Sequence, residues 1–294
     1  MLYSTKCTSV FFYWCILSFL FIASSVFSQS LKEYEQQLQA IAPKMLSDST
    51  EELRYDAHTA FQEVWELILD DPKSIKYNFD SLTTFPILDS KDGKLRIINW
   101  MVPKDNGTCE YFAIAQYFDS SKRYKVDYLE AITSEIRQPK SYVTKDKEWI
   151  GALYYQISSF KRGKRTYYLL MGWDGNDDKS NRKIAEVVSI SSKLRFGAPV
   201  FRKGKDKMQR FILQYNKEAS VSMKYYPKEE RILFSHLIPI NPNFEGLYDY
   251  YVSDGGQDEF VLKNGVFHYK SNAEITQKVD VPDRKKLRRG LLPR

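Results

Sequence analysis

The spacing of apolar residues near the start of the chain predicts helices. Apolar positions recur every three or four residues from Leu31 to Ala42, and Pro43 ends that run. A second run follows Ser49, which with Glu52 has the spacing of a capping box, and its apolar face continues to Ile68. We therefore expect residues 29–72 to form a helical segment that caps or flanks the rest of the chain.

From about residue 76 the pattern changes to short strand-like runs separated by turn signals. Asn106-Gly107 lies between the apolar runs 95–101 and 109–118, and this dipeptide between two such runs is a strong hairpin signal. Further strands are expected at residues 149–158, 166–173, 184–190, 199–201, 209–215, 221–226, 231–237, 248–252, 259–263 and 266–270. We expect residues 73–271 to form one mainly β domain, an antiparallel meander that is barrel-like or propeller-like, with a β-sandwich as the alternative.

Residues 1–28 have the pattern of a cleavable signal peptide. Lys6 precedes an apolar run over residues 10–26, and the small or neutral side chains of Val26 and Ser28 suit a cleavage site before Gln29. An uncleaved anchor is the alternative, because the 17-residue run is at the lower limit for crossing a bilayer. We expect an exported protein, periplasmic or extracellular.

Basic residues are concentrated at the other end of the chain. Residues 278–294 hold seven basic and two acidic side chains, which accounts for +5 of the formal net charge of +7. The central basic run consists of Arg284, Lys285, Lys286, Arg288 and Arg289. We expect residues 272–294 to be a flexible tail that binds an anionic envelope surface, with an inert solvated tail as the alternative. The nearly neutral remainder argues against a nucleic-acid partner.

The loop after residue 173 offers a calcium hypothesis. Asp174, Asn176 and Asp178 place oxygen-bearing side chains at alternate positions, as calcium loops do. The glycine and the bidentate glutamate of the full motif are missing, since Lys179 and Ala185 stand at those positions. A polar turn that binds its own backbone is the favoured interpretation, and no other cofactor is expected.

Signatures of catalysis are sparse. The sequence contains no HExxH, GxSxG or CxxC motif and three widely spaced histidines, one of them His236. Asp254, Asp258 and Glu259 lie in and after a glycine-rich turn and could supply an acid and a base, although any solvated hairpin offers the same residues. Cys109 is the one cysteine beyond residue 28, and we expect it to be packed as a small hydrophobic residue.

Aromatic residues are abundant, with 21 Tyr and 18 Phe. Adjacent pairs such as Tyr154-Tyr155 and Tyr225-Tyr226, and the segment 248–251, could form a face that stacks on sugars or binds a protein. The alternative is ordinary sheet packing, in which one ring of each pair points inward and the next points outward.

Several segments resemble an uncharacterised family of secreted proteins from Bacteroidetes-type bacteria. The resemblance is carried by residues 79–82, 92–100, 168–176, 196–201, 236–239 and 245–248. It implies export and a single domain, and it brings no assigned activity or catalytic residue.

We therefore expect an exported soluble envelope protein of the binding or structural kind, without enzymatic activity. A hydrolase acting on envelope polysaccharide or peptide is the first alternative, and a calcium-stabilised adhesion module is the second.

Overall fold

A computed structural model describes residues 30–132 and 138–273. The predicted signal peptide and the predicted basic run at residues 284–289 lie outside the described residues. Within those residues, no helix is both long enough and apolar enough to span a membrane.

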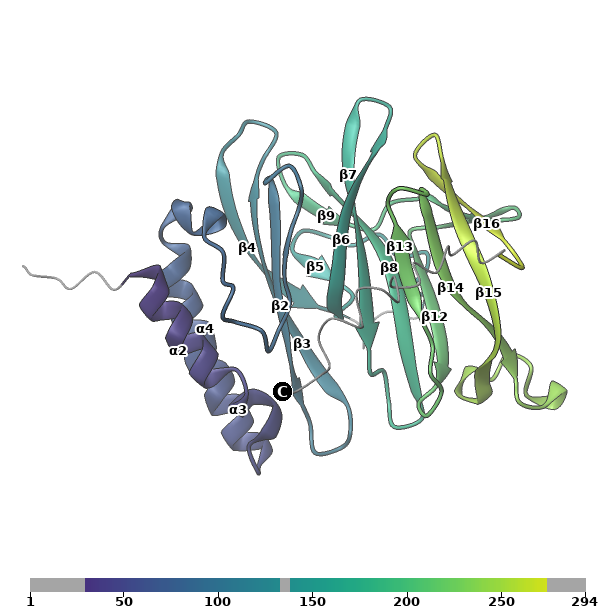
Figure 1. Cartoon of the computed structure of the whole chain (residues 1–294), viewed down its shortest axis with the longest axis horizontal. Coiled ribbons are helices and arrows are strands. Elements are labelled where there is room, and N and C mark those ends of the chain that lie inside the picture. Colours follow the sequence, from purple (N-terminus) through teal and green to yellow (C-terminus); the bar gives the residue numbers. More distant parts are fainter. Residues whose placement is uncertain (1–29, 133–137, 274–294) are drawn as a thin grey trace, which may run out of the picture.

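The molecule is a stack of one helical layer and three β-sheets, in chain order from left to right in Figure 1. The helical layer contains α2 (Leu31–Ile41), α3 (Lys44–Ser47) and α4 (Glu51–Leu69), followed by the 3-10 turn η1 (Pro72–Lys76). The first sheet contains β1 (Ile87–Asp89), β2 (Leu95–Pro103), β3 (Cys109–Phe118), β4 (Tyr124–Ala131) and β5 (Glu148–Trp149), in that order.

The second sheet has the order β12-β8-β7-β6, with β9 paired to β8. Its strands are β6 (Leu153–Arg162), β7 (Arg165–Asp174), β8 (Ser180–Ile190), β9 (Leu194–Phe196) and β12 (Arg210–Asn216). The third sheet has the order β11-β10-β16-β15-β14-β13. Its strands are β10 (Phe201–Lys203), β11 (Asp206–Met208), β13 (Met223–Tyr226), β14 (Arg231–Pro239), β15 (Tyr251–Lys263) and β16 (Val266–Lys270).

Side-chain alternation along the strands produces a separate core between each pair of layers. On β2, Ile98 and Trp100 pack against the helices, whereas Ile97 packs against the second sheet. On β7, Leu170 faces the first sheet and Leu169 faces the third. The middle sheets are thus covered on both faces, which explains their nearly continuous apolar runs.

The predicted helical cap is confirmed, with a shift in its capping residues. The N-cap of α4 is Thr50, whose side chain accepts a hydrogen bond from the Leu53 amide, rather than the expected Ser49. A complete capping box is found at α2 instead, where Ser30 and Glu33 bond each other's backbone amides.

The mainly β class and the meander are also confirmed, with differences of detail. No closed barrel forms among the described strands, and the sheets stack face to face as in the sandwich alternative. Two strand pairs, β4–β5 and β10–β16, are parallel. The strand β4 was not expected. The run 259–263 belongs to the longer strand β15, which begins at Tyr251, whereas residues 248–250 form a 3-10 turn instead of a strand.

Two amide side chains join successive sheets at their edges. Asn99 of β2 accepts from the Tyr154 backbone amide of β6 at 2.6 Å and donates to its carbonyl at 3.3 Å. Gln156 of β6 makes the same pair of bonds with Tyr225 of β13, at 3.1 and 2.8 Å. Each amide therefore occupies the free backbone groups of an edge strand in the following sheet.

Candidate ligand-binding site

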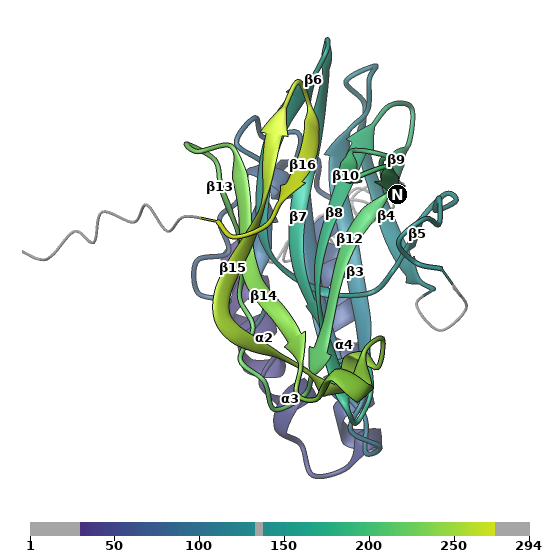
Figure 2. The same cartoon turned by 90° about the vertical axis from the view of Figure 1, so that its right-hand side faces the viewer.

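A cavity among the described residues lies between the second and third sheets, where β12 faces β14, β15 and β16. It has a volume of about 670 Å³, within the range of small-molecule sites. Its end wall is the connection between β14 and β15, which contains η3 (Pro242–Phe244) and η4 (Tyr248–Tyr250) and packs beside β12 (Figure 2).

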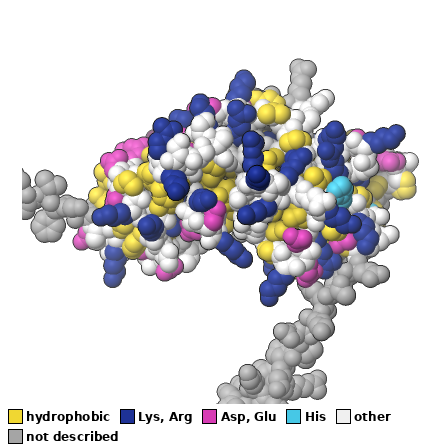
Figure 3. All heavy atoms as spheres, turned by 90° about the horizontal axis from the view of Figure 1, so that it is seen from above, with side chains coloured by type: hydrophobic (Ala, Val, Ile, Leu, Met, Phe, Trp, Pro, Cys, Tyr) yellow, Lys and Arg dark blue, Asp and Glu magenta, His cyan; other side chains and the backbone are white. Residues whose placement is uncertain are grey.

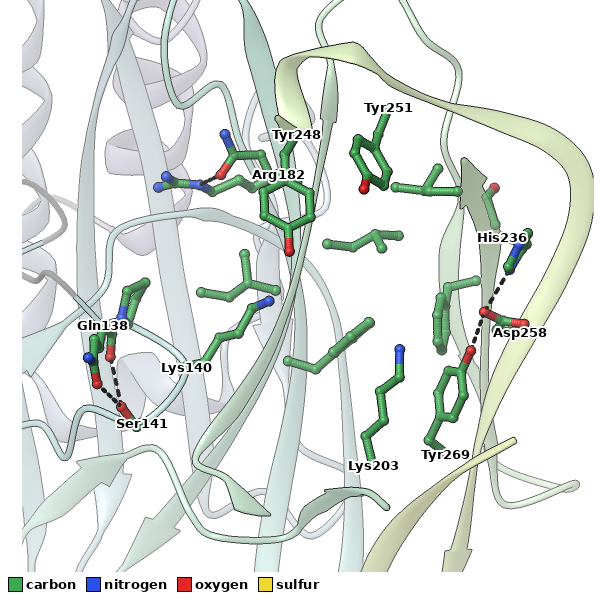
Figure 4. Close-up of a pocket in the computed structure, with 18 residues that line it drawn as sticks. Gln138, Lys140, Ser141, Arg182, Lys203, His236, Tyr248, Tyr251, Asp258 and Tyr269 are labelled. Carbon is green, nitrogen blue, oxygen red and sulfur yellow. Dashed lines mark hydrogen bonds and ion pairs between the residues drawn. The ribbon is translucent and has the colours of Figure 1, made fainter. Parts of the chain in front are cut away.

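Basic side chains line this cavity from three separate elements. Lys140 comes from the connection before β5, Lys203 from β10 and Arg182 from β8. The ammonium groups of Lys140 and Lys203 point toward the open centre, whereas the Arg182 guanidinium points away from it toward Gln214 (Figure 4). Arg182 is also 3.6 Å from Asp174, so its charge is partly compensated.

Lys140 and Lys203 have no ion-pair partner among the residues that the structure describes. Partial burial lowers the pKa of Lys140, and the neighbouring charges of Lys203 and Arg182 lower it further. Elsewhere, on the face shown in Figure 3, Lys and Arg side chains are spread among acidic and apolar ones. Lys140 and Lys203 therefore bring two positive charges into the cavity that a ligand could neutralise.

Tyrosine rings form the walls around these ammonium groups. Lys140 Nζ lies 5.8 Å from the centre of the Tyr248 ring, and Lys203 Nζ lies 4.3 Å from that of Tyr269. The hydroxyl groups of Tyr248 and Tyr251 point into the cavity (Figure 4). The floor is apolar, with Phe211, Leu213, Phe234 and Leu237 among its members.

Two of the tyrosines considered for an aromatic binding face lie in this cavity. Tyr248 and Tyr251 line the cavity, as the segment 248–251 suggested. In the adjacent pair Tyr154-Tyr155, the first ring is fully buried and the second is exposed, which is the alternation expected from sheet packing.

One side of the cavity carries a histidine held by a carboxylate. His236 Nδ1 lies 3.0 Å from Asp258 Oδ2, which also accepts from the Tyr269 hydroxyl at 2.7 Å. The Asn272 amide donates to the other Asp258 oxygen. Burial alone raises the pKa of Asp258, but the hydrogen bonds from His236, Tyr269 and Asn272 outweigh it and hold the pKa below its ordinary value.

A β-bulge places this histidine. Ser235 pairs with Gln257 and Leu237 pairs with Ser253, so His236 alone stands opposite residues 254–256. Gly255 has a φ of +88°, in the left-handed region that favours glycine. The extra residues bring Asp254 Oδ2 to 4.0 Å from His236 Nε2.

Of the three acidic residues noted in the sequence, only the two aspartates lie beside His236. Asp254 and Asp258 approach opposite nitrogens of His236. Glu259 lies apart from them and pairs with Arg231 and Lys270.

A buried ion pair positions the segment that carries Lys140. Arg210 Nε lies 2.6 Å from Glu186 Oε1, both side chains are fully buried, and Tyr154 also bonds Glu186. The Arg210 guanidinium donates to the carbonyls of Pro139 and Tyr142, so it fixes the backbone on both sides of Lys140. The Gln209 amide adds a bond to the Lys140 carbonyl at 2.8 Å.

The residues of the calcium hypothesis form a self-bonded turn. Asp174 is buried and accepts from the Asn176 amide, while Asp178 is exposed. Burial raises the pKa of Asp174, despite the nearby Arg182. Within the described ranges, no group of three His, Cys, Asp or Glu side chains could hold a metal ion. Calcium binding stays a prediction for this loop.

Cys109 is a free, partly buried cysteine that packs against the core between the first two sheets. Burial raises the pKa of its thiol, and the negative charge of Asp174 adds to the effect. Both effects disfavour the reactive thiolate form.

Sequence reasoning singled out some of these residues and missed others. Asp258, Tyr248 and the lone His236 were all noted, although nothing in the sequence linked them. Lys140 and Lys203 carried no local signal, because each is one lysine among many in a connection or a short strand. No protein family, curated protein or solved structure matches the chain, and the resemblance to secreted bacterial proteins stays a prediction.

Proposed function

We propose that the protein is an exported envelope protein that binds an acidic saccharide in the cavity between the second and third sheets. The observation that carries the proposal is the pair of ammonium groups of Lys140 and Lys203, which face an apolar, tyrosine-walled cavity without an ion-pair partner among the described residues. The signal-like residues 1–28 motivate the location, which is a proposal of the same standing.

The chemistry of the cavity suits the two sides of a sugar acid. The apolar face of a pyranose ring stacks on aromatic rings such as Tyr248 and Tyr269. Its hydroxyl groups can bond the phenol groups of Tyr248 and Tyr251, and its carboxylate can be placed between the two ammonium groups. A cavity of about 670 Å³ has room for more than one sugar unit.

The test is calorimetric binding of a galacturonate trisaccharide, with maltotriose as the uncharged comparison. Lys140→Gln and Lys203→Gln should each weaken binding at least about tenfold, because a charge-assisted hydrogen bond contributes roughly 1.5–3 kcal/mol. Lys205→Gln is the matched control, since Lys205 is an exposed lysine outside the cavity lining. Added salt should weaken binding of the acidic ligand alone. Equal binding of maltotriose, or no loss in either cavity variant, would contradict the proposal.

Hydrolysis of an envelope polysaccharide or peptide is the second candidate. It is favoured by His236, because a carboxylate at Nδ1 orients an imidazole for general base catalysis. Release of reducing ends from polygalacturonate, lost in His236→Gln, would support this candidate. Binding of the trisaccharide without release of reducing ends would contradict hydrolysis and support binding as the function of the cavity.

A further inference from the structure

Most of one edge of the first sheet has no strand beside it. The sheet has the order β1-β2-β3-β4-β5, but β5 pairs with β4 only at residues 130 and 131. Residues 124–129 of β4 therefore form an open edge in the described part of the chain. An open edge offers its free backbone groups to a strand of another chain, which is the basis of association by strand addition.

The hairpin between β3 and β4 determines which backbone groups of β4 are free. In its turn the Asp119 amide donates to the Arg123 carbonyl at 3.0 Å. Hydrogen-bonded pairs alternate with non-hydrogen-bonded pairs along an antiparallel ladder. Continuing that alternation along the register of β3 and β4, the odd-numbered residues of β4 bond to β3 and the even-numbered ones point outward.

The end of β4 agrees with this alternation. Glu130 is even-numbered, and its amide donates outward to the Lys147 carbonyl just before β5. The backbone groups of Tyr124, Val126 and Tyr128 point the same way, and no hydrogen bond to them is formed by any described residue. These residues therefore present a row of unpaired donors and acceptors along the edge.

The side chains of β4 suit a second copy of the same strand. In an antiparallel pair centred on Val126, Lys125 of one chain stands opposite Asp127 of the other, and two-fold symmetry repeats this contact. Lys125 has no ion-pair partner among the described residues. Asp127 accepts a hydrogen bond from the Tyr117 hydroxyl at 2.7 Å through one oxygen, which leaves its other oxygen for the lysine. Opposite charges at facing positions stabilise a strand pair.

The same register also brings aromatic side chains together. Tyr124 stands opposite Tyr128 of the second chain on either side of Val126, and facing aromatic residues favour strand pairing. Tyr128 is exposed in the single chain. Charged residues on an edge ordinarily keep strands of different molecules apart. Here the order Tyr-Lys-Val-Asp-Tyr is self-complementary about its centre, so the charges favour one partner and one register.

We propose that β4 is the contact strand of a two-fold symmetric dimer, in which the strands of two chains pair antiparallel about Val126 and join their first sheets. The outward backbone groups then form about six intermolecular hydrogen bonds. No residue of this edge lines the cavity between the second and third sheets, so the proposal is independent of the binding function. An interface built on one strand is small, which corresponds to a Kd on the order of 10 μM.

Sedimentation velocity between about 1 and about 500 μM protein tests this dimer. Lys125→Glu and Asp127→Lys should each weaken association at least tenfold, because each puts like charges at both facing positions. An equimolar mixture of the two variants should recover association, since every facing position of the mixed dimer holds opposite charges. Lys205→Glu is the matched control, because it makes the same charge change at an exposed residue of the turn between β10 and β11.

Hydrogen exchange, resolved to single residues by mass spectrometry, is a second readout that needs no variant. The amides of Tyr124, Val126 and Tyr128 should be protected at the highest concentration and should exchange rapidly at the lowest, because only a second chain binds them. The amides of Lys125 and Asp127 bond to β3 and should be protected at both concentrations. This comparison decides the question even if Asp127→Lys fails to fold after losing its bond to Tyr117.

Recovery in the mixture and concentration-dependent protection of the three outward amides would both support the dimer. A protein that stays monomeric at about 500 μM would overturn the proposal. A dimer that tolerates both charge variants would overturn it as well, because association would then use another surface. Folded variants that both lose association without recovering it in the mixture would show that Lys125 and Asp127 do not face each other.

Discussion

Asp258 shows how a single residue can be kept ionised inside a largely apolar wall. Its side chain is nearly inaccessible, which by itself favours the neutral acid. Donors from β14, β16 and the chain after β16 surround the carboxylate, and together they favour the charged form. The same carboxylate therefore orients His236 and the ring of Tyr269 along one side of the cavity.

We expect Asp258→Asn to lower the free energy of unfolding by about 1–3 kcal/mol at neutral pH, because donors lose a charged acceptor. The folded-state pKa of Asp258 is lowered, so its contribution is complete above the ordinary value of about 4 and is lost as the pH falls through the folded-state value. Chemical denaturation of both proteins should therefore give a stability difference that is constant above about pH 5 and shrinks at lower pH.

Tyr269→Phe serves as the comparison, since it removes one donor and keeps the ring. Its stability deficit should be smaller than that of Asp258→Asn. A stability difference for Asp258→Asn that is independent of pH down to about 2 would show that the carboxylate is not stabilised in its charged form.

At the scale of an element, the segment before β5 matters most, because it brings Lys140 into the cavity. The segment has little secondary structure of its own between residues 138 and 147. Its position depends on Arg210, whose guanidinium is neutralised by Glu186 on one side and bonds two carbonyls of the segment on the other. The buried Arg210–Glu186 ion pair therefore helps to position Lys140, although Lys140 contacts neither of the two side chains.

Arg210→Met should reduce the free energy of unfolding by about 3–5 kcal/mol, because it leaves the Glu186 charge buried without a partner. The double variant with Glu186→Gln should recover much of that loss, as measured by thermal denaturation. Binding of the galacturonate trisaccharide should stay weak in the double variant, because nothing restores the hold on the Lys140 segment. Full recovery of both stability and affinity would show that Arg210 has no positioning role.

Local signals explain which elements the sequence could predict. The bounds of β3 and β16 were predicted correctly, because alternating apolar runs flank clear Asn-Gly turns. β4 was missed, since it mixes Lys125, Asp127 and Glu130 with apolar residues and is largely exposed or half-buried. The binding site could not be predicted, because Lys140 and Lys203 come from separate segments that line one cavity only after the segment before β5 packs against the later sheets.

At the scale of the whole molecule, the layers follow one another in chain order, except that β10 and β11 of the third sheet precede β12 of the second. Each pair of layers encloses its own core. The binding cavity lies in the gap between the last two sheets. Its shape therefore depends on how these sheets are held together, which in part depends on the Gln156 bonds to β13.

Replacing the two joining amides should have unequal effects. Asn99→Ala should reduce the free energy of unfolding by about 2–4 kcal/mol, because the fully buried Tyr154 backbone loses both partners. Gln156→Ala should reduce it by about 1 kcal/mol, because the bonds to Tyr225 are only partly buried. Urea denaturation of both variants measures this order, and a larger loss for Gln156→Ala would contradict it.

The two joining amides, Asn99 and Gln156, also suit an order in which the sheets form one after another. Asn99 precedes the strand that it holds by 55 residues, and Gln156 precedes its own by 69. Each amide therefore already belongs to an earlier sheet when the edge strand that it binds is synthesised. A chain that emerges from the ribosome amino end first can add one sheet after another, with each finished layer serving as the template for the edge of the next.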